Sequence, residues 1–290
     1  MFLKERGAGN VQNIHGVRNL LYMAPQRALV AEELHGSSWV ADRARSFIGT
    51  NHGRHPWLLT LGFIAPHPPF NVPPGYEELY RDADFPEPLA SRTKTSPLSE
   101  ENRMLGDLPT PAMLRRMREA YYAMVSHVDH QVGRVLDALE ESGQKENTLV
   151  IFTSDHGELL GDYGLYQKWL PYDACSRIPM ILRWPEKVER GSRSDEFVDL
   201  ADLYPTMLAA GGVSDPMPEE LSGEDLFTDS PKKERGRQFV EYSSGNRRWI
   251  SLRRASWKYN YYFGGGLEEL FDLDADPKES TNLLEGSSGR

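Results

Sequence analysis

Apolar residues along this chain follow two patterns: some form short continuous runs, and others recur at the spacing of a helix. Residues 57–64 (WLLTLGFI), 149–153 and 178–183 are short continuous runs, which are typical of buried strands in a parallel sheet. Residues 38–52 and 110–143 repeat apolar side chains every three or four positions, which predicts amphipathic helices. The order strand, crossover, helix, strand predicts a right-handed βαβ connection.

The last part of the chain changes to a shorter period. Four short segments predict strands joined by turns: 238–242, 249–254, 257–263 and 270–273. We interpret them as a small antiparallel annex over residues 236–290, which follows a larger domain over residues 1–235. The predicted fold class is α/β, in three layers, with a mixed, mainly parallel sheet between helices and the antiparallel annex at the C-terminus.

Composition and charge exclude several classes of protein. The 290 residues include 39% hydrophobic ones, which is enough to build a core, and they carry a net charge of −10. A binder of nucleic acid or of an anionic membrane needs a basic face, so neither partner is expected. The single cysteine, Cys175, excludes an internal disulfide framework and a CxxC metal site.

Signals for membranes and targeting are not visible in the sequence. No apolar run approaches the roughly 18 residues that a membrane-spanning helix needs. The start of the chain, MFLKERGAGNVQNIHG, lacks the apolar centre of a secretory signal. The default expectation is therefore a cytoplasmic protein, unless the native N-terminus lies outside this chain.

Asp155 and His156 are the first candidate ligands for a metal ion. They follow the predicted strand at 149–153, and ligands gather beyond the carboxyl ends of strands in open α/β sheets. A carboxylate and an imidazole are both common metal ligands. The alternative is a helix cap with a surface histidine beside it, and two ligands do not complete a metal site.

Lys168 and His67 are the other candidate site residues. Lys168 lies twelve residues after His156, and His67 lies in a proline-rich loop after the strand at 57–64. His67 has the chemistry of a general acid or of a donor to an oxyanion. Chemistry alone also allows a solvated lysine and a capping or core histidine.

Other reactive side chains have simpler interpretations. Glu158 and Asp162 fit the first turns of a helix as well as they fit an acidic site. Cys175 precedes a predicted strand and is interpreted as a buried thiol rather than a nucleophile. No Ser-His-Asp arrangement, P-loop or GxGxxG motif stands out.

Several segments, taken together and in their order, resemble the sulfatase family within the alkaline phosphatase superfamily. The most characteristic block spans residues 120–185 and contains VIFTSDHGELLGDYGLYQKW. The others are WLLTLGFIAPHPPF at 57–70, FVDLADLYPTMLAAGGV at 197–213, LSGEDLF at 221–227 and ASWKYNYYFGGGLEELFDLDADPKESTNL at 255–283. The resemblance implies an alkaline phosphatase-like fold and a metal-dependent sulfuric ester hydrolase.

The resemblance also implies roles for individual residues. Asp155 and His156 would ligate a divalent cation, for which calcium is the first expectation and manganese or another metal the alternative. Lys168 would contact the anionic oxygens of the ester, and His67 would do the same or protonate the leaving-group oxygen. The expected substrate is a small-molecule or saccharide sulfate ester. Many family members have Asn where His156 stands, and the Asp-His form leaves open a phosphodiesterase or phosphonate monoester hydrolase on the same scaffold.

One departure from the family pattern is large. Sulfatases carry C-x-P-S-R or S-x-P-S-R near the N-terminus, where the first residue becomes formylglycine, and this chain contains neither motif. Cys175-Ser176-Arg177 has the wrong spacing and the wrong place in the chain. The sequence thus resembles the C-terminal portion of a sulfatase, incomplete at its N-terminus and inactive alone. It would pair with a separately encoded N-terminal half, or it is a non-catalytic remnant or accessory subunit.

Overall fold

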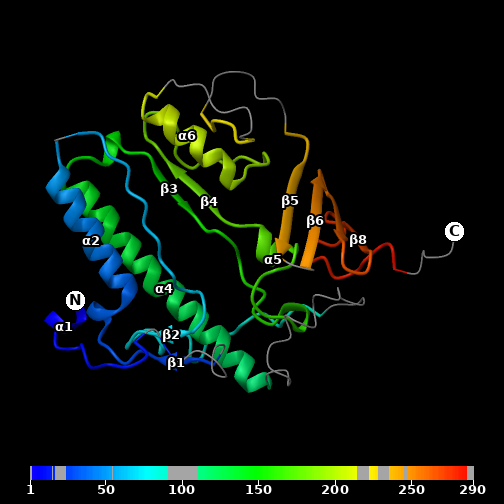
Figure 1. Ribbon diagram of the computed structural model, residues 1–290, viewed down its shortest axis with the longest axis horizontal. Coiled ribbons are helices and arrows are strands. Elements are labelled where there is room, and N and C mark those ends of the chain that lie inside the picture. Colours follow the sequence, from blue (N-terminus) through cyan, green and yellow to red (C-terminus); the bar gives the residue numbers. More distant parts are fainter. Residues whose placement is uncertain are drawn as a thin grey trace. The chain divides into compact units, whose positions relative to one another are not determined.

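The computed structural model describes residues 2–14, 16, 24–53, 55–90, 110–213, 222–227, 235–244 and 247–285 (Figure 1). The chain divides into two compact units. The first comprises Met1–Glu87 and Pro109–Thr148, and the second comprises Pro88–Leu108 and Leu149–Arg290. The boundary that the sequence suggests between residues 235 and 236 stays a prediction.

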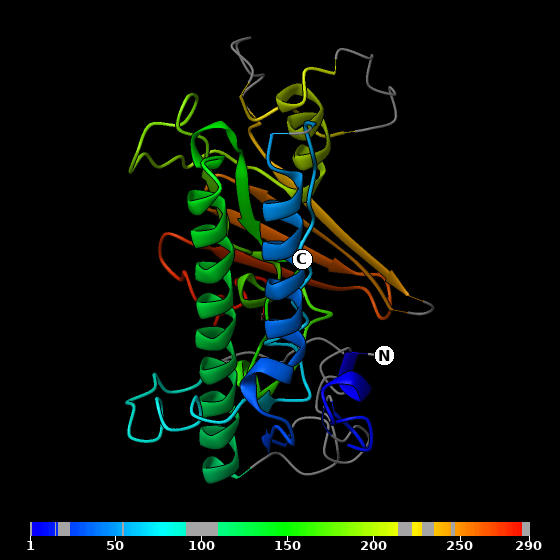
Figure 2. The ribbon, with the colours of Figure 1, turned by 90° about the vertical axis from the view of Figure 1, so that its left-hand side faces the viewer.

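The first unit is built on two long helices, α2 (Gly36–Asn51) and α4 (Pro111–Glu141). They pack against each other along their lengths, as Figure 2 shows. The Thr110 hydroxyl caps α4 by accepting the backbone N–H of Met113, and Pro111 occupies the first turn. Both predicted helices are therefore confirmed, because spacing and capping are local signals.

Short elements complete the first unit. They are α1 (Phe2–Glu5), β1 (Gln26–Arg27), η2 (Glu32–Leu34), β2 (Asn71–Val72) and η3 (Lys145–Asn147). The strands β1 and β2 pair in parallel, with Gln26 opposite Asn71. Phe70, just before β2, is fully buried and its ring meets Tyr121 of α4 edge to face.

Residues 57–64 differ from the prediction of a buried parallel strand. They run extended, and their side chains alternate between half-buried and exposed positions, with Leu58 69% and Ile64 75% exposed. Within the part of the chain that the structure describes, no backbone hydrogen bond joins residues 57–63 to another strand. An apolar run becomes a buried strand only when partner strands are present, and pairing cannot be read from the run itself.

The second unit contains a pair of strands and a four-stranded sheet. The strands β3 (Val150–Thr153) and β4 (Met180–Arg183) pair with each other in antiparallel fashion. The helical segments are η4 (Asp162–Gly164), α5 (Asp173–Ser176), η5 (Leu200–Asp202) and α6 (Leu203–Ala210). The positions of β3 and β4 match the prediction. The predicted burial of both strands is wrong in part, since Ile181 of β4 is 60% exposed.

The C-terminal sheet confirms the predicted antiparallel annex. Its strands lie in the order β5 (Gln238–Ser244), β6 (Arg247–Arg254), β7 (Trp257–Tyr262) and β8 (Leu267–Asp272). All neighbouring pairs are antiparallel. One face of this sheet contributes Trp249, Tyr262 and Phe271 to the core of the second unit. Helices with both parallel and antiparallel strands make the fold α/β, as predicted.

No helix among the described residues combines the length and the apolar character that crossing a bilayer requires.

A buried histidine lies between the two long helices of the first unit. His127 of α4 is fully buried, with its Nε2 3.2 Å from the Ser38 hydroxyl oxygen of α2. Its buried Nδ1 has no hydrogen-bond partner among the described residues. Burial, helped by the nearby His35, His130 and Arg134, lowers the pKa of His127 from 6.5 to about 3.

The buried neutral His127 predicts a loss of stability in acid. An unfolded chain protonates this histidine below about pH 6.5, while the folded chain resists protonation down to about pH 3. The stabilisation is complete above pH 6.5 and falls as the pH is lowered, by at most about 1.4 kcal/mol per pH unit for one proton. Urea unfolding between pH 7 and pH 4 should show a smaller decrease in His127→Gln than in wild type. His55→Gln, an exposed control, should follow wild type, and identical curves for both variants would refute the assignment.

The exposed extended segment predicts self-association of the isolated chain. Unpaired strand backbone with apolar side chains is a template for pairing with another chain. Analytical ultracentrifugation should show concentration-dependent oligomers, which Leu58→Lys with Ile64→Lys reduces. Leu79→Lys is the control, since Leu79 is similarly exposed but lies in a turn. A monomer with one sharp, cooperative unfolding transition would contradict the prediction.

Candidate active site in the second unit

The turn after β3 places Asp155 and His156 side by side. The Ser154 hydroxyl donates to the His156 carbonyl over 2.8 Å, and the His156 backbone N–H donates to Asp155 Oδ1 over 3.0 Å. These bonds give the end of the strand a fixed turn rather than the first turn of a helix. Among the described residues no helix begins at this point. The alternative that Asp155 caps a helix is therefore wrong.

Gly157 fits this turn because it passes close to α5. Its N–H donates to the Cys175 carbonyl over 2.8 Å. A Cβ atom on Gly157 would lie 2.1 Å from the Ala174 carbonyl oxygen, which is inside van der Waals contact. The sequence Asp-His-Gly therefore needs its glycine for space, and the turn is fixed to α5 through backbone atoms.

The chemistry of Asp155 and His156 fits two ligands of a divalent cation. His156 Nδ1 lies 2.8 Å from the Gly157 carbonyl oxygen, so this nitrogen is a donor and Nε2 is the ring nitrogen left to face a metal ion. Nε2 is 3.5 Å from Asp155 Oδ2, and the Asp155 side chain is 81% exposed. Over the described ranges, no cluster of three or more potential ligands occurs, so these two do not complete a metal site.

Lys168 belongs to the same unit and lies close to acidic groups. Burial lowers the pKa of its ammonium, while the carboxylates of Glu158 and Asp155 oppose that shift. The Lys168 Nζ also lies 5.2 Å from the centre of the Trp169 ring, within reach of a cation–π contact. Lys168 is thus half-buried, near Asp155, and not the solvated lysine that chemistry alone allowed.

Glu158 has a role that the sequence did not indicate. Its carboxylate accepts the backbone N–H groups of Leu160 and Gln167 and so closes the loop that carries Lys168. Burial raises the pKa of this carboxyl, and the two backbone donors together with Lys168 oppose the rise. The only sequence signal for this role was an acidic residue two positions after His156, and such a residue fits the first turn of a helix equally well.

The backbone between His156 and Pro171 is unusual. Four residues other than glycine have positive φ here: Leu160 (46°), Tyr163 (57°), Gln167 (66°) and Trp169 (89°). Such conformations cost about 1–3 kcal/mol each and persist only where the surroundings enforce them. They cluster on both sides of Lys168, as strained residues do at functional sites.

His67 lies in the first unit, in the loop that follows the extended segment. Its backbone N–H donates to the Ile64 carbonyl over 3.0 Å, and its Nδ1 lies 2.7 Å from the Pro68 carbonyl oxygen. That bond places the proton on Nδ1 and orients the half-buried ring. Among the predicted site residues, Asp155, His156 and Lys168 share one unit, and His67 belongs to the other.

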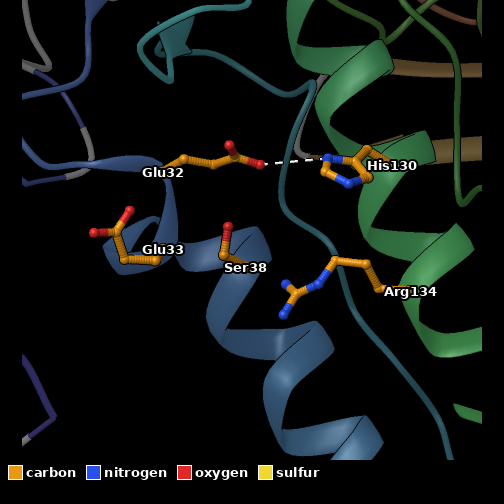
Figure 3. A pocket seen from close by; sticks show the side chains of 5 residues that line it. All are labelled: Glu32, Glu33, Ser38, His130 and Arg134. Atoms are coloured by element: carbon orange, nitrogen blue, oxygen red, sulfur yellow. Dashed lines mark ion pairs between the residues drawn. The ribbon is translucent and has the colours of Figure 1, made fainter.

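A separate pocket lies in the first unit and contains none of the predicted site residues. Its volume is about 310 Å³, and it is lined by Glu32, Glu33, Ser38, His130 and Arg134. Figure 3 shows Glu32 and His130 pointing toward each other, with 3.4 Å between Glu32 Oε1 and His130 Nδ1. Arg134 pairs with Asp42, so the lining side chains mainly connect η2 and α2 to α4.

Comparisons with known proteins agree with the motif order. Residues 9–213 match the family model described as sulfatase, and residues 161–289 match that of the N-sulphoglucosamine sulphohydrolase C-terminal region. An arylsulfatase of Clostridium perfringens is 34% identical over 262 residues, which is 87% of this chain and 54% of that protein. A choline-sulfatase of Rhizobium meliloti is 29% identical over 82% of this chain and 48% of that protein.

Solved structures show the same fold. The phosphonate monoester hydrolase of Agrobacterium radiobacter superposes with a TM-score of 0.81 at 24% identity, over 99% of this chain and 64% of that chain. The present chain spans about half the length of the curated relatives that it matches. The matched fold is the α/β architecture that the sequence predicted.

Cys175 is a buried thiol, as predicted. Only 5% of its surface is exposed, and burial raises the pKa of the thiol to about 12. At pH 8 almost no thiolate forms, so a disulfide reagent should react with the native chain far more slowly than with the unfolded chain. Because the chain has one cysteine, any signal belongs to Cys175, and Cys175→Ser provides the blank. Rapid labelling of the native chain would contradict this prediction.

Proposed function

Because this chain belongs to the sulfatase family, we propose that it carries part of the active site for hydrolysing sulfate esters. The proposed part consists of Asp155, His156 and Lys168. One observation carries the proposal. The Asp155 carboxylate and the His156 imidazole lie together at the end of β3, and Asp155 favours the charged form of the half-buried Lys168 ammonium. Two potential metal ligands and a nearby ammonium can stabilise the negative charge of an anionic group during its transfer.

The proposed metal ligands are Asp155 Oδ2 and His156 Nε2. A hydrogen bond from the other ring nitrogen to a carbonyl fixes the ring of a metal-binding histidine, and His156 makes such a bond to Gly157. A divalent cation at these atoms, proposed to be calcium, would supply Lewis-acid stabilisation of negative charge. Because the Asp155 carboxylate is exposed, a cation bound to it would remain accessible to additional ligands.

Lys168 is proposed to bind the anionic oxygens of the ester. A half-buried ammonium stabilises developing negative charge more strongly than a solvated one, because the surrounding medium screens it less. Hydrogen bonds on both sides of Lys168 fix its backbone, so little reorganisation is needed when the substrate arrives.

His67 is proposed to stabilise charge on the leaving-group oxygen or to protonate it. Its Nδ1 is engaged with the Pro68 carbonyl, so Nε2 is the nitrogen that would hold the transferred proton. This assignment is supported by the P-H-x-P loop at residues 66–69, which resembles the family pattern.

The nucleophile is proposed to come from polypeptide outside these 290 residues, since they contain neither C-x-P-S-R nor S-x-P-S-R. Formylglycine at such a motif would supply the nucleophilic oxygen for the reaction. The proposed substrate is a small-molecule or saccharide sulfate ester. A polypeptide that supplies the missing motif, encoded separately or continuous with this chain, is the proposed partner.

A phosphonate monoester hydrolase is the second candidate. The observation that favours it is the high structural similarity to the Agrobacterium enzyme, together with His156 at the position where many sulfatases have asparagine. Both reactions transfer a tetrahedral anionic group, so Lys168 and the metal ligands would serve either one. Parallel assays on matched phenyl esters of sulfate and phosphonate separate the two.

The proposal predicts an inactive chain that becomes active with its missing part. The purified chain should not hydrolyse 4-nitrophenyl sulfate above background. Co-expression with the N-terminal half of a related sulfatase, matured to formylglycine, should restore turnover. Lys168→Ala should then lower kcat/KM by about 100-fold or more, as loss of an oxyanion donor does, whereas the exposed control Lys187→Ala should not.

Two results would contradict the proposal. One is turnover of sulfate esters by the purified chain alone that Lys168→Ala abolishes, because the nucleophile would then lie within these 290 residues. The other is a confirmed complex of the two halves that hydrolyses neither sulfate nor phosphonate esters, which would favour the non-catalytic interpretation.

A further inference from the structure

The left-handed backbone at Trp169 is held by the C-terminal sheet. The Trp249 indole N–H of β6 donates to the Trp169 carbonyl over 2.7 Å. Trp249 itself is buried in the core of the second unit, so its indole has a fixed position. A short bond from a fixed donor can enforce a φ of 89° that a large aromatic residue would otherwise avoid.

Two further contacts hold the side chain of Trp169. Its ring centre lies 5.5 Å from that of Tyr242 on β5, and its Nε1 donates to Gln167 Oε1 over 3.2 Å. Tyr242 is the cross-strand partner of Trp249, and their rings stack with centres 5.9 Å apart. Adjacent strands of the sheet therefore hold both the carbonyl and the ring of Trp169.

Lys168 depends on these contacts through chain geometry. The φ angle of Trp169 is the rotation about its N–Cα bond, which joins Lys168 on one side to the held carbonyl on the other. If Trp169 relaxed to an ordinary negative φ, Lys168 would move relative to the sheet. On the other side, the Glu158 carboxylate accepts the Gln167 N–H, so the residues before and after Lys168 are both anchored.

We propose that Trp249 is a positioning residue for Lys168. By holding the Trp169 carbonyl, it keeps the Lys168 ammonium where the anionic oxygens of a sulfate ester are bound. This inference rests on the proposed function for the role of Lys168 in binding the anion. It assigns part of the active-site geometry to a tryptophan of the C-terminal sheet, 81 residues after the lysine in the sequence.

Trp249→Phe tests the proposal because phenylalanine keeps an aromatic ring and removes the N–H donor. Trp257→Phe is the matched control, since Trp257 is a half-exposed tryptophan on the neighbouring strand β7. The full chain is labelled by reductive methylation with 13C, and the Lys168 signal is identified by its loss in Lys168→Arg. Its titration midpoint and its response to added inorganic sulfate are then followed by NMR.

In wild type, Lys168 should titrate below the ordinary lysine range because of burial. In Trp249→Phe the midpoint should rise toward the ordinary value, and the apparent affinity for sulfate should fall about tenfold, which corresponds to about 1.4 kcal/mol. Trp257→Phe should match wild type in both. The groups that face the ammonium, Glu158, Asp155 and Cys175, are the same in all variants, so a difference reports the position of the lysine.

Each alternative outcome gives a decision. An unchanged midpoint and sulfate affinity in a folded Trp249→Phe would overturn the proposal while leaving the proposed function intact. A shifted midpoint with no sulfate response in wild type would support positioning and count against the anion-binding role of Lys168. If circular dichroism shows that Trp249→Phe is unfolded, hydrogen exchange of the Trp249 indole N–H in wild type decides. Slow exchange supports the proposal, and exchange as fast as that of the half-exposed Trp257 indole would show that no bond holds the Trp169 carbonyl and would overturn it.

Discussion

Hydrogen bonds to the two residues that flank Lys168 are the constraint on which the candidate site depends. A carboxylate accepts the N–H before the lysine, and an indole donates to the carbonyl after it. Several residues with positive φ occur in the same loop, and they are tolerated because these external partners compensate for the strain. The result is a half-buried ammonium on an ordered backbone, next to the turn that presents Asp155 and His156.

The fold was predictable where the signals are local. The helix α4 matches its predicted bounds within two residues because Thr110, Pro111 and an apolar stripe specify it independently of the rest of the chain. Residues 57–64 have an equally clear apolar run, yet they form no strand in the described structure. A strand needs hydrogen-bond partners from elsewhere, and composition does not say whether those partners are present.

The candidate site was predictable only in part, for a related reason. Asp155, His156 and Lys168 lie within fourteen residues of one another, and their motif could be recognised in the sequence. Trp249 could not be connected to them, because its contact with Trp169 crosses 80 residues and depends on the register of β5 with β6. Glu158 was visible in the sequence, but its use as an acceptor for two backbone N–H groups depends on positive φ angles that no local pattern predicts.

The bond between Trp249 and Trp169 has a consequence for how such a protein can evolve. A C-terminal sheet that looks like a detachable module is commonly treated as exchangeable by recombination. Here an exchanged sheet would have to deliver an indole donor at one particular point of β6, or the lysine loop would lose its support. Inheritance of the sheet and of the loop is therefore coupled, and the boundary between them is a poor place for a crossover.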